Sequence, residues 1–189
     1  MKKFTVPTIE DAKPASKVIF HKIEKDFGFL PNIYAFLGHA PNTLANFLQL
    51  RASNSAGSFN ERELEAIYLA VSQENESEYC IAVHTFMGKN VGFNSEETVQ
   101  LRVGNHPEKK LSILSSLARE IQKTHGEPND ELLNEFFDLG YDEAALVELV
   151  ALVMEKSFVN YLQKIAKLKL DFPEAPRFNH QAGSEFVSF

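Results

Sequence analysis

The sequence predicts an all-α fold, a single-domain helical bundle, from three observations. Apolar residues recur at intervals of three and four positions along most of the chain, which is the spacing of one helix face. No run alternates apolar and polar residues as a half-buried strand does, and neither Asn-Gly nor Asp-Gly, the common hairpin turns, occurs. A chain of 189 residues is long enough for one well-buried core. We expect residues 1–176 to form this domain and residues 177–189 an irregular C-terminal tail.

Prolines and polar residues mark the helix starts expected in the first half of the chain. Proline suits the first position of a helix, because the N–H that it lacks has no partner there. Asn60, with Glu63 three positions later, has the form of a capping box, in which each side chain accepts from the other's backbone N–H. Ser77 is a suitable N-cap for the helix that follows it. The expected helices cover residues 14–27, 33–37, 41–56, 61–73 and 78–89.

The second half continues the pattern and ends in a long helix. Shorter helices are expected over residues 95–103, 107–121 and 129–140, each opened by a serine, proline or asparagine. The longest helix is expected from about Asp142 to Lys169. Seven of its apolar residues are expected to enter the core: Leu146, Leu149, Val150, Val153, Phe158, Leu162 and Ile165.

Composition and charge exclude several classes of protein. The 19 Lys and Arg residues against 26 Asp and Glu leave a net charge of −7, so the chain lacks the basic surface that nucleic acid or an anionic membrane attracts. No segment approaches the roughly 20 apolar residues that span a bilayer, and the first residues lack the apolar run of a signal peptide. The single cysteine excludes an internal disulfide. We therefore expect a cytoplasmic protein with neither nucleic acid nor membrane as a partner.

The sequence contains no motif for a bound metal or cofactor. The six histidines lack the spacing of metal ligands such as His-Glu-x-x-His, and a single cysteine excludes cysteine-based zinc clusters. Neither a Gly-rich phosphate loop nor a Gly-x-Ser-x-Gly turn occurs. We therefore expect no metal and no organic cofactor.

Cys80 and His84 form the strongest candidate site. If Ser77 caps its helix, Cys80 is the third residue of that helix, where free backbone N–H groups and the helix dipole favour a thiolate. His84 follows four positions later on the same helix face, so it could accept the thiol proton directly or through water. Glu65, on the preceding helix, could hold His84 in one tautomer. A deprotonated thiol near a base is the minimum for a nucleophilic or peroxide-reactive cysteine.

Each of these residues also has a purely structural interpretation. A lone cysteine in a helical protein is often a small buried hydrophobe, and a lone histidine often makes a structural hydrogen bond. Glu65 stands close to Glu61 and Glu63 and could be solvated. Tyr68 and Tyr79 fit positions in the core or in an interface as well as they fit proton donors. Spacing alone leaves both interpretations open.

The segment around these residues resembles a known family. Glu65, followed by Cys80 and His84 within Glu-Asn-x-x-x-Tyr-Cys-x-x-x-His-Thr, is similar to the active-site signature of the alkylhydroperoxidase D-like proteins, which belong to the carboxymuconolactone decarboxylase superfamily. The resemblance covers residues 10–176 and is nearest to the peroxidase-related branch. It implies an all-helical fold of that type. It also implies a catalytic centre formed by Cys80, His84, Glu65 and Ser77. The supporting residues that it implies around this centre are Tyr79, Tyr68 and Thr85.

The chain departs from that family at one cysteine. Redox-active members carry Cys-x-x-Cys, and Cys80 takes the position of the second cysteine, which by the resemblance attacks peroxide. Ser77 takes the position of the first, so the disulfide that such enzymes close after turnover cannot form here. Tyr79 also stands where some members have a histidine. The dithiol cycle of the family is therefore not expected in this chain.

Three functions fit these residues, and we expect the first. In an antioxidant thiol peroxidase of the peroxiredoxin type, Glu65 orients His84, His84 deprotonates Cys80, and the thiolate reduces a small-molecule hydroperoxide with an external thiol or dithiol as reductant. In a non-redox acid–base enzyme of the carboxymuconolactone decarboxylase type, Cys80 is incidental, and Arg51 or Arg62 would face the pocket to bind an anionic substrate. The third function is that of a catalytically silent helical scaffold.

The family resemblance also implies a homo-oligomer built from helical interfaces. A dimer is the default on symmetry grounds, and trimers and hexamers occur among similar proteins. The apolar helices and the C-terminal arm are the candidate contacts.

Overall fold

The computed structural model describes residues 4–177, and over that range the chain is all-helical without strands, as the sequence predicts. The predicted tail lies outside the described residues from position 178 onwards. The helices are α1 (Pro14–Phe27), α2 (Asn32–Leu37), α3 (Pro41–Asn54), α4 (Glu61–Glu74), α5 (Glu78–Asn90), α6 (Ser95–Arg102), α7 (Lys109–Thr124), α8 (Asp130–Asp138) and α9 (Glu143–Ala166).

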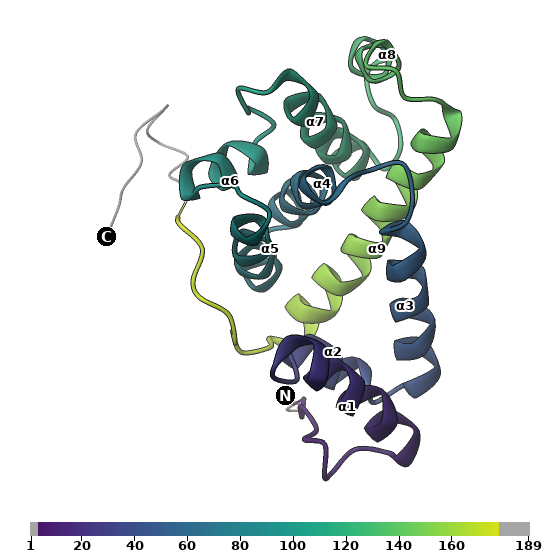
Figure 1. Cartoon of the computed structure of the whole chain (residues 1–189), viewed down its shortest axis with the longest axis vertical. Helices are drawn as coiled ribbons and strands as arrows, with labels where there is room; N and C mark the ends of the chain where they lie inside the picture. The colour runs from purple at the N-terminus through teal and green to yellow at the C-terminus, as the bar shows by residue number, and fades with distance from the viewer. Residues whose placement is uncertain (1–3, 178–189) are drawn as a thin grey trace.

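Helix α4 lies at the centre of the molecule and packs against α5, α6, α7 and α9 (Figure 1). Its residues from Glu63 to Ser72 are all buried. The expected capping box forms at its start, because Asn60 Oδ1 accepts from the Glu63 N–H at 3.1 Å and Glu63 Oε2 accepts from the Asn60 N–H at 3.0 Å. Since this part of α4 is buried on every side, the polar side chains within it need partners inside the protein.

Two apolar clusters fill most of the interior, and α9 contributes to both. One cluster joins α4, α7 and α8 to the first half of α9, as far as Val153. The other joins α1, α2, α3 and α5 to the second half of α9, starting at Val159. Between these two residues, Glu155, Lys156 and Ser157 are buried although they are polar. A polar layer therefore separates the two apolar clusters.

The structure corrects three expectations about the later helices. Helix α7 begins at Lys109 rather than at Pro107. Helix α9 ends at Ala166, because Lys167 adopts a left-handed conformation (φ 50°) and its N–H binds Gln163 O. The predicted core face of α9 was also too wide, since three of its residues are exposed: Val150 by 38%, Phe158 by 37% and Ile165 by 62%. A helix that carries apolar residues on more than one face buries only those that face its neighbours.

No helix within residues 4–177 combines the length and the apolar character needed to cross a membrane.

Asn60→Ala tests the capping box of the central helix. The variant should lose about 1 kcal/mol of unfolding free energy, because N–H groups at the start of α4 lose their side-chain acceptor. Chemical denaturation followed by circular dichroism measures this loss. The matched control is Asn105→Ala, at an exposed loop position between α6 and α7, which should change the unfolding free energy by less than about 0.5 kcal/mol. Equal effects of the two variants would contradict the capping role.

Candidate active site

Cys80 lies in the first turn of α5, as its third residue, and lines a small internal cavity. Its side chain is a free, buried thiol. The cavity has a volume of about 30 Å³, which is room for about one or two water molecules. Apolar and aromatic side chains make up most of its wall. The full lining is Phe27, Pro31, Ile33, Tyr34, Phe47, Arg51, Tyr79, Cys80, Val83, His84, Met87, Lys156, Val159 and Phe172.

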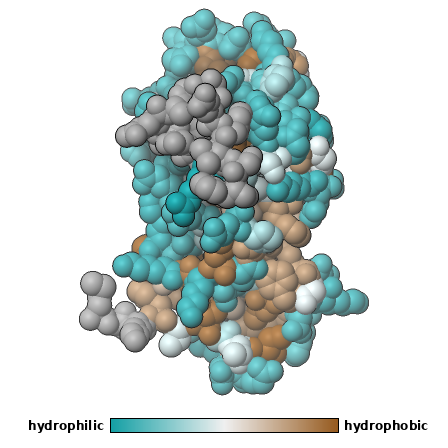
Figure 2. Space-filling view, turned by 90° about the vertical axis from the view of Figure 1, so that its left-hand side faces the viewer, coloured by the Kyte–Doolittle hydropathy of each residue, from teal (hydrophilic) through white to brown (hydrophobic). Residues whose placement is uncertain are grey.

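Phe172, in the segment after α9, closes one side of this cavity. The centroid of its ring lies 5.3 Å from that of Phe29 and 5.8 Å from that of Phe86. The preceding residue, Asp171, ties the segment to α2, because its Oδ2 accepts from the Asn32 N–H at 2.5 Å. Phe29 and Phe86 are themselves partly exposed. Figure 2 faces the side of the molecule that carries α5 and this segment, and it shows apolar surface gathered on the lower half.

The structure brings His84 and Glu65 together, one from α5 and the other from α4. His84 Nδ1 lies 2.7 Å from Glu65 Oε2, and both side chains are buried. A carboxylate accepts the Nδ1 proton, so the imidazole carries its proton on Nδ1 and leaves Nε2 as an acceptor. Burial, and secondly the nearby Lys156 charge, lower the pKa of His84 to about 4. The imidazole is therefore neutral at physiological pH.

Lys156 on α9 extends this pair into a chain of three groups. Its Nζ lies 2.6 Å from His84 Nε2 and 4.1 Å from the centroid of the Tyr68 ring. The side chain is buried, and burial lowers the pKa of Lys156. Lys156 also lines the cavity that contains Cys80. The hydrogen-bonded chain thus runs from Glu65 through His84 to Lys156.

Glu155 is a second buried carboxylate, and it is connected to the site through its hydrogen bond with Tyr68. Its Oε2 accepts from the Tyr68 hydroxyl at 3.2 Å and from Asn54 Nδ2 at 2.8 Å. The Tyr68 ring also packs against His84, with centroids 4.9 Å apart. Burial, and then the Glu155 charge, raise the pKa of Tyr68, so its hydroxyl stays protonated and donates. Tyr68 therefore contacts both Glu155, through its hydroxyl, and His84, through its ring.

Ser77 occupies the N-cap position of α5, but its side chain does not cap the helix as expected. The hydroxyl instead donates to Gln163 Oε1 on α9, at 2.9 Å. The nearby α9 side chain offers this hydroxyl a different acceptor, so the first-turn N–H groups gain no partner from Ser77.

Tyr79 and Thr85, the other residues expected around the site, have different positions. Tyr79 lines the cavity, and its hydroxyl accepts from the Ile33 N–H at 3.3 Å. Burial raises the pKa of Tyr79, so its hydroxyl stays protonated. Thr85 is buried but does not line the cavity, and its hydroxyl has no hydrogen-bond partner within residues 4–177.

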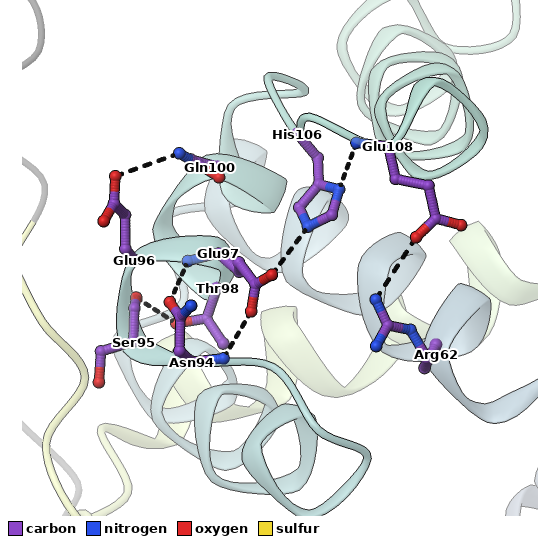
Figure 3. Close-up of polar contacts among 9 residues, drawn as sticks. All are labelled: Arg62, Asn94, Ser95, Glu96, Glu97, Thr98, Gln100, His106 and Glu108. Atoms are coloured by element: carbon purple, nitrogen blue, oxygen red, sulfur yellow. Dashed lines mark hydrogen bonds and ion pairs between the residues drawn. The ribbon is translucent and has the colours of Figure 1, made fainter.

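Of the two arginines considered for an anionic substrate, the structure brings Arg51 to the cavity. Its Nη1 donates to the Tyr34 hydroxyl at 2.7 Å, and both residues line the wall. Arg62 lies elsewhere, over the ring of Phe93 and 3.4 Å from the carboxylate of Glu108. Figure 3 shows the Arg62 guanidinium directed at Glu108 and, on the other side of the view, a second capping box that joins Asn94 to Glu97.

Two buried residues of the site, Glu155 and Lys156, were missed by sequence reasoning. Both lie within the apolar run of α9, between Val153 and Val159. The available signal for a buried polar site was the pair of adjacent opposite charges inside this apolar run. A helix face that only packs against apolar neighbours would carry no charged residues. No group of three or more His, Cys, Asp or Glu side chains that could hold a metal occurs within the described residues.

The comparisons with known proteins agree with this fold. Residues 40–105 match the model of the Carboxymuconolactone decarboxylase family. No curated protein matches the sequence.

Several solved structures share the fold. An uncharacterized peroxidase-related protein from Ralstonia eutropha JMP134, described as an alkylhydroperoxidase AhpD core, matches with a TM-score of 0.79 and 17% identity, over 89% of this chain and 92% of that chain. A similar protein from Silicibacter sp. TM1040 matches with a TM-score of 0.74 and 14% identity, over 89% and 92%. A cysteine-to-alanine variant of the debrominase Bmp8, in complex with 2,3,4-tribromopyrrole, matches with a TM-score of 0.76 and 19% identity, over 90% and 93%.

The all-helical arrangement is thus that of the AhpD-like proteins. Residues 40–105 match the Carboxymuconolactone decarboxylase family model, so this segment and the shared fold both support the resemblance inferred from the sequence. Because the sequence identities to these solved structures are below 20%, the similarity shows a shared fold only.

The low pKa of His84 predicts how stability depends on pH. Between about pH 6.5, the ordinary value for histidine, and about pH 4, the unfolded chain binds a proton at His84 that the folded chain does not. Stability should therefore fall as the pH drops through this window, by on the order of 3 kcal/mol from this group. Above it, His84 should contribute no pH dependence.

Chemical denaturation between pH 7 and pH 4 measures this dependence, and His84→Asn should flatten the His84 part of it. In the unaltered protein, NMR of the His84 imidazole should show a neutral ring down to about pH 5. A ring that becomes protonated near pH 6.5 would contradict the buried, hydrogen-bonded environment described above.

Proposed function

We propose that this protein is a thiol peroxidase that reduces hydroperoxides through a single cysteine, with an external thiol as reductant. The position of Cys80 carries the proposal, since the thiol lies in the first turn of α5 and lines an apolar cavity together with His84 and Lys156. The helix dipole and the nearby Lys156 side chain both stabilise negative charge that develops on the sulfur during attack. The peroxidase-related description of two fold neighbours agrees with it.

The proposed reaction takes place in two stages at one sulfur atom. The Cys80 thiolate attacks the terminal oxygen of a hydroperoxide, so an S–O bond forms, the O–O bond breaks, and an alcohol leaves after it gains a proton. Cys80 is then a sulfenic acid. A first external thiol condenses with it to a mixed disulfide and releases water, and a second thiol displaces Cys80 as a free thiol. Two thiols are thereby oxidised to one disulfide for each peroxide reduced.

The compartment follows from this chemistry. Because the chain has one cysteine, the second sulfur must come from a thiol or dithiol in solution. Such thiols are abundant in reducing compartments. We therefore propose that the protein works in the cytoplasm.

One observation favours a second candidate, the non-redox acid–base enzyme. Arg51 lines the cavity and has donors beyond the one that binds Tyr34, so an anionic substrate would find a cation there. In that reaction Glu65 and His84 would transfer protons and Cys80 would be incidental. Turnover of a small organic acid that survives the loss of Cys80 would favour this candidate.

Cys80→Ser tests the proposed peroxidase. Peroxide consumption with dithiothreitol as reductant should fall to the uncatalysed rate, because an alcohol at this position is not nucleophilic enough to attack the O–O bond. The assay measures loss of hydrogen peroxide and of tert-butyl hydroperoxide, and mass spectrometry detects sulfenic acid on Cys80. Wild-type protein alkylated at Cys80 serves as the control and should behave like the variant.

Unchanged peroxide consumption in Cys80→Ser would contradict the proposal. Wild-type protein that consumes no peroxide and forms no sulfenic acid would also contradict it, and would favour the acid–base enzyme or the silent scaffold.

We also propose that the protein is a homo-oligomer in which a second copy covers the outer face of α9. Six exposed apolar or aromatic residues follow one another along this helix with steps of three and four, and we call them the α9 stripe: Val147, Val150, Met154, Phe158, Tyr161 and Ile165. No exposed residue of α9 from Val147 to Tyr161 is charged. A charge-free stripe on a single helix can pair with itself about a two-fold axis.

Met154→Glu tests this interface. Met154 is 68% exposed at the middle of the α9 stripe, so a carboxylate there should leave the fold intact but should face its own copy across a two-fold contact. The variant should shift from oligomer to monomer in sedimentation velocity or light scattering. The matched control is Asn134→Glu at an exposed position of α8, which should leave the mass unchanged. A wild-type monomer, or an unchanged mass in Met154→Glu, would contradict the interface.

A further inference from the structure

Both ring nitrogens of His84 are occupied by other groups, which bears on how the site handles protons. Nδ1 lies 2.7 Å from Glu65 Oε2, and Nε2 lies 2.6 Å from Lys156 Nζ. With its proton on Nδ1, the imidazole accepts at Nε2 from an N–H of Lys156, which the amine and the ammonium form both offer. No nitrogen of His84 is then left to accept a proton from the Cys80 thiol. His84 lines the cavity as Lys156 does, but this base expected from the sequence has no free nitrogen there.

Lys156 is the last group of this hydrogen-bonded chain, it also lines the cavity, and it has no carboxylate partner. No carboxylate oxygen within residues 4–177 lies within 4.0 Å of its nitrogen. Glu155, its neighbour in sequence, is hydrogen-bonded to Asn54 and Tyr68 instead. A buried ammonium without an ion pair costs folding free energy, so its placement is not explained by stability.

We propose that Lys156 is a catalytic residue that carries the proton from the Cys80 thiol to the oxygen that leaves, with His84 and Glu65 as its positioning residues. This inference rests on the proposed peroxidase function. It assigns to Lys156 the role of base that the sequence assigned to His84, and adds the role of acid toward the leaving oxygen. It gives His84 the task of holding the nitrogen of Lys156 in place.

The proton returns to its starting point in each cycle. The Lys156 amine takes the proton of the Cys80 thiol, which gives an ammonium and a thiolate. The thiolate attacks the terminal oxygen of the hydroperoxide, the S–O bond forms, and the O–O bond breaks with both of its electrons on the leaving oxygen. The ammonium donates its proton to that oxygen, which leaves as an alcohol. Lys156 is then an amine again, and Cys80 is a sulfenic acid.

The geometry of the cavity supports this assignment. Cys80 and Lys156 both line a space of about 30 Å³, so a peroxide group that reaches the sulfur lies close to the lysine as well. The face of the Tyr68 ring, 4.1 Å from the nitrogen, attracts the ammonium form. Burial acts in the opposite direction and lowers the pKa of Lys156, which brings the amine form within reach. A lysine balanced in this way can both accept and donate a proton.

Lys156→Met tests the proposal with two peroxides that differ in their leaving group. Tert-butyl hydroperoxide must expel an alkoxide, which leaves readily only when it is protonated. Peroxyacetic acid expels acetate, which is stable as an anion. The ratio of the second-order rate constants, peroxyacetic acid over tert-butyl hydroperoxide, should rise about 100-fold in Lys156→Met, because general acid catalysis is lost for one substrate only. A general loss of structure or of thiolate would slow both reactions and leave the ratio unchanged.

The matched control is Lys164→Met, two turns later on α9 and partly exposed, which should leave the ratio at its wild-type value. A second measurement needs no variant. In the wild-type protein, the solvent deuterium isotope effect should be larger with tert-butyl hydroperoxide than with peroxyacetic acid, because a proton moves to the leaving oxygen only in the first case.

The outcomes separate this inference from the proposed function. Cys80-dependent turnover with an unchanged ratio in Lys156→Met overturns the role of Lys156 and leaves the peroxidase in place. Equal isotope effects with the two peroxides overturn that role as well, even if the variant does not fold. No Cys80-dependent turnover with either peroxide overturns the peroxidase function and this inference together.

Discussion

The burial of residues 63–72 of α4 on all sides is the constraint on which the rest of the site depends. Four helices enclose this part of α4, so its polar side chains cannot turn to water and need partners within the protein. Glu63 pairs with Lys110 of α7, Glu65 with His84 of α5, and Tyr68 with Glu155 of α9. These contacts fix the positions of α5 and α9 relative to the central helix. The same contacts that complete the packing of α4 therefore bring His84 and Lys156 to the wall of one cavity.

The site lies where the two apolar clusters meet on α9. Val153 belongs to one cluster and Val159 to the other, and of the buried polar residues between them Lys156 lines the cavity. A low-dielectric surrounding strengthens every charge in that layer. It keeps the imidazole of His84 neutral, so that Nε2 of this ring accepts a hydrogen bond from Lys156. The arrangement suits proton transfer over short distances in a space too small for bulk water.

Most of the fold could be predicted from local features of the sequence, whereas the site could be predicted only in part. Pro14, Pro41 and the Asn60–Glu63 pair act within one turn of the chain, so the starts of α1, α3 and α4 were predictable. The outer face of α9 was not, because its sequence is apolar on more than one side and only the neighbouring helices decide which side is covered. Cys80 and His84 share one helix and could be paired by spacing. Lys156 reaches them from the far end of the chain, and no local rule connects residues so distant in sequence. Ser77 was misjudged for the same reason, because its acceptor, Gln163, also lies on α9.

The segment after α9 directly influences the chemistry of Cys80 and His84, because it forms part of the wall of the cavity that they line. Phe172 forms part of the cavity wall, and its segment is anchored to Asn32 of α2, whose N–H donates to Asp171 Oδ2 and whose Nδ2 donates to Lys169 O. If that anchor opened, water would enter the cavity, and the desolvation that keeps His84 uncharged would weaken. The proton affinity of a histidine in the interior is therefore tied to the docking of a surface segment. Any molecule that binds near Phe29 or Phe86 and draws Phe172 away would act on the site without touching a single residue of the Glu65–His84–Lys156 chain.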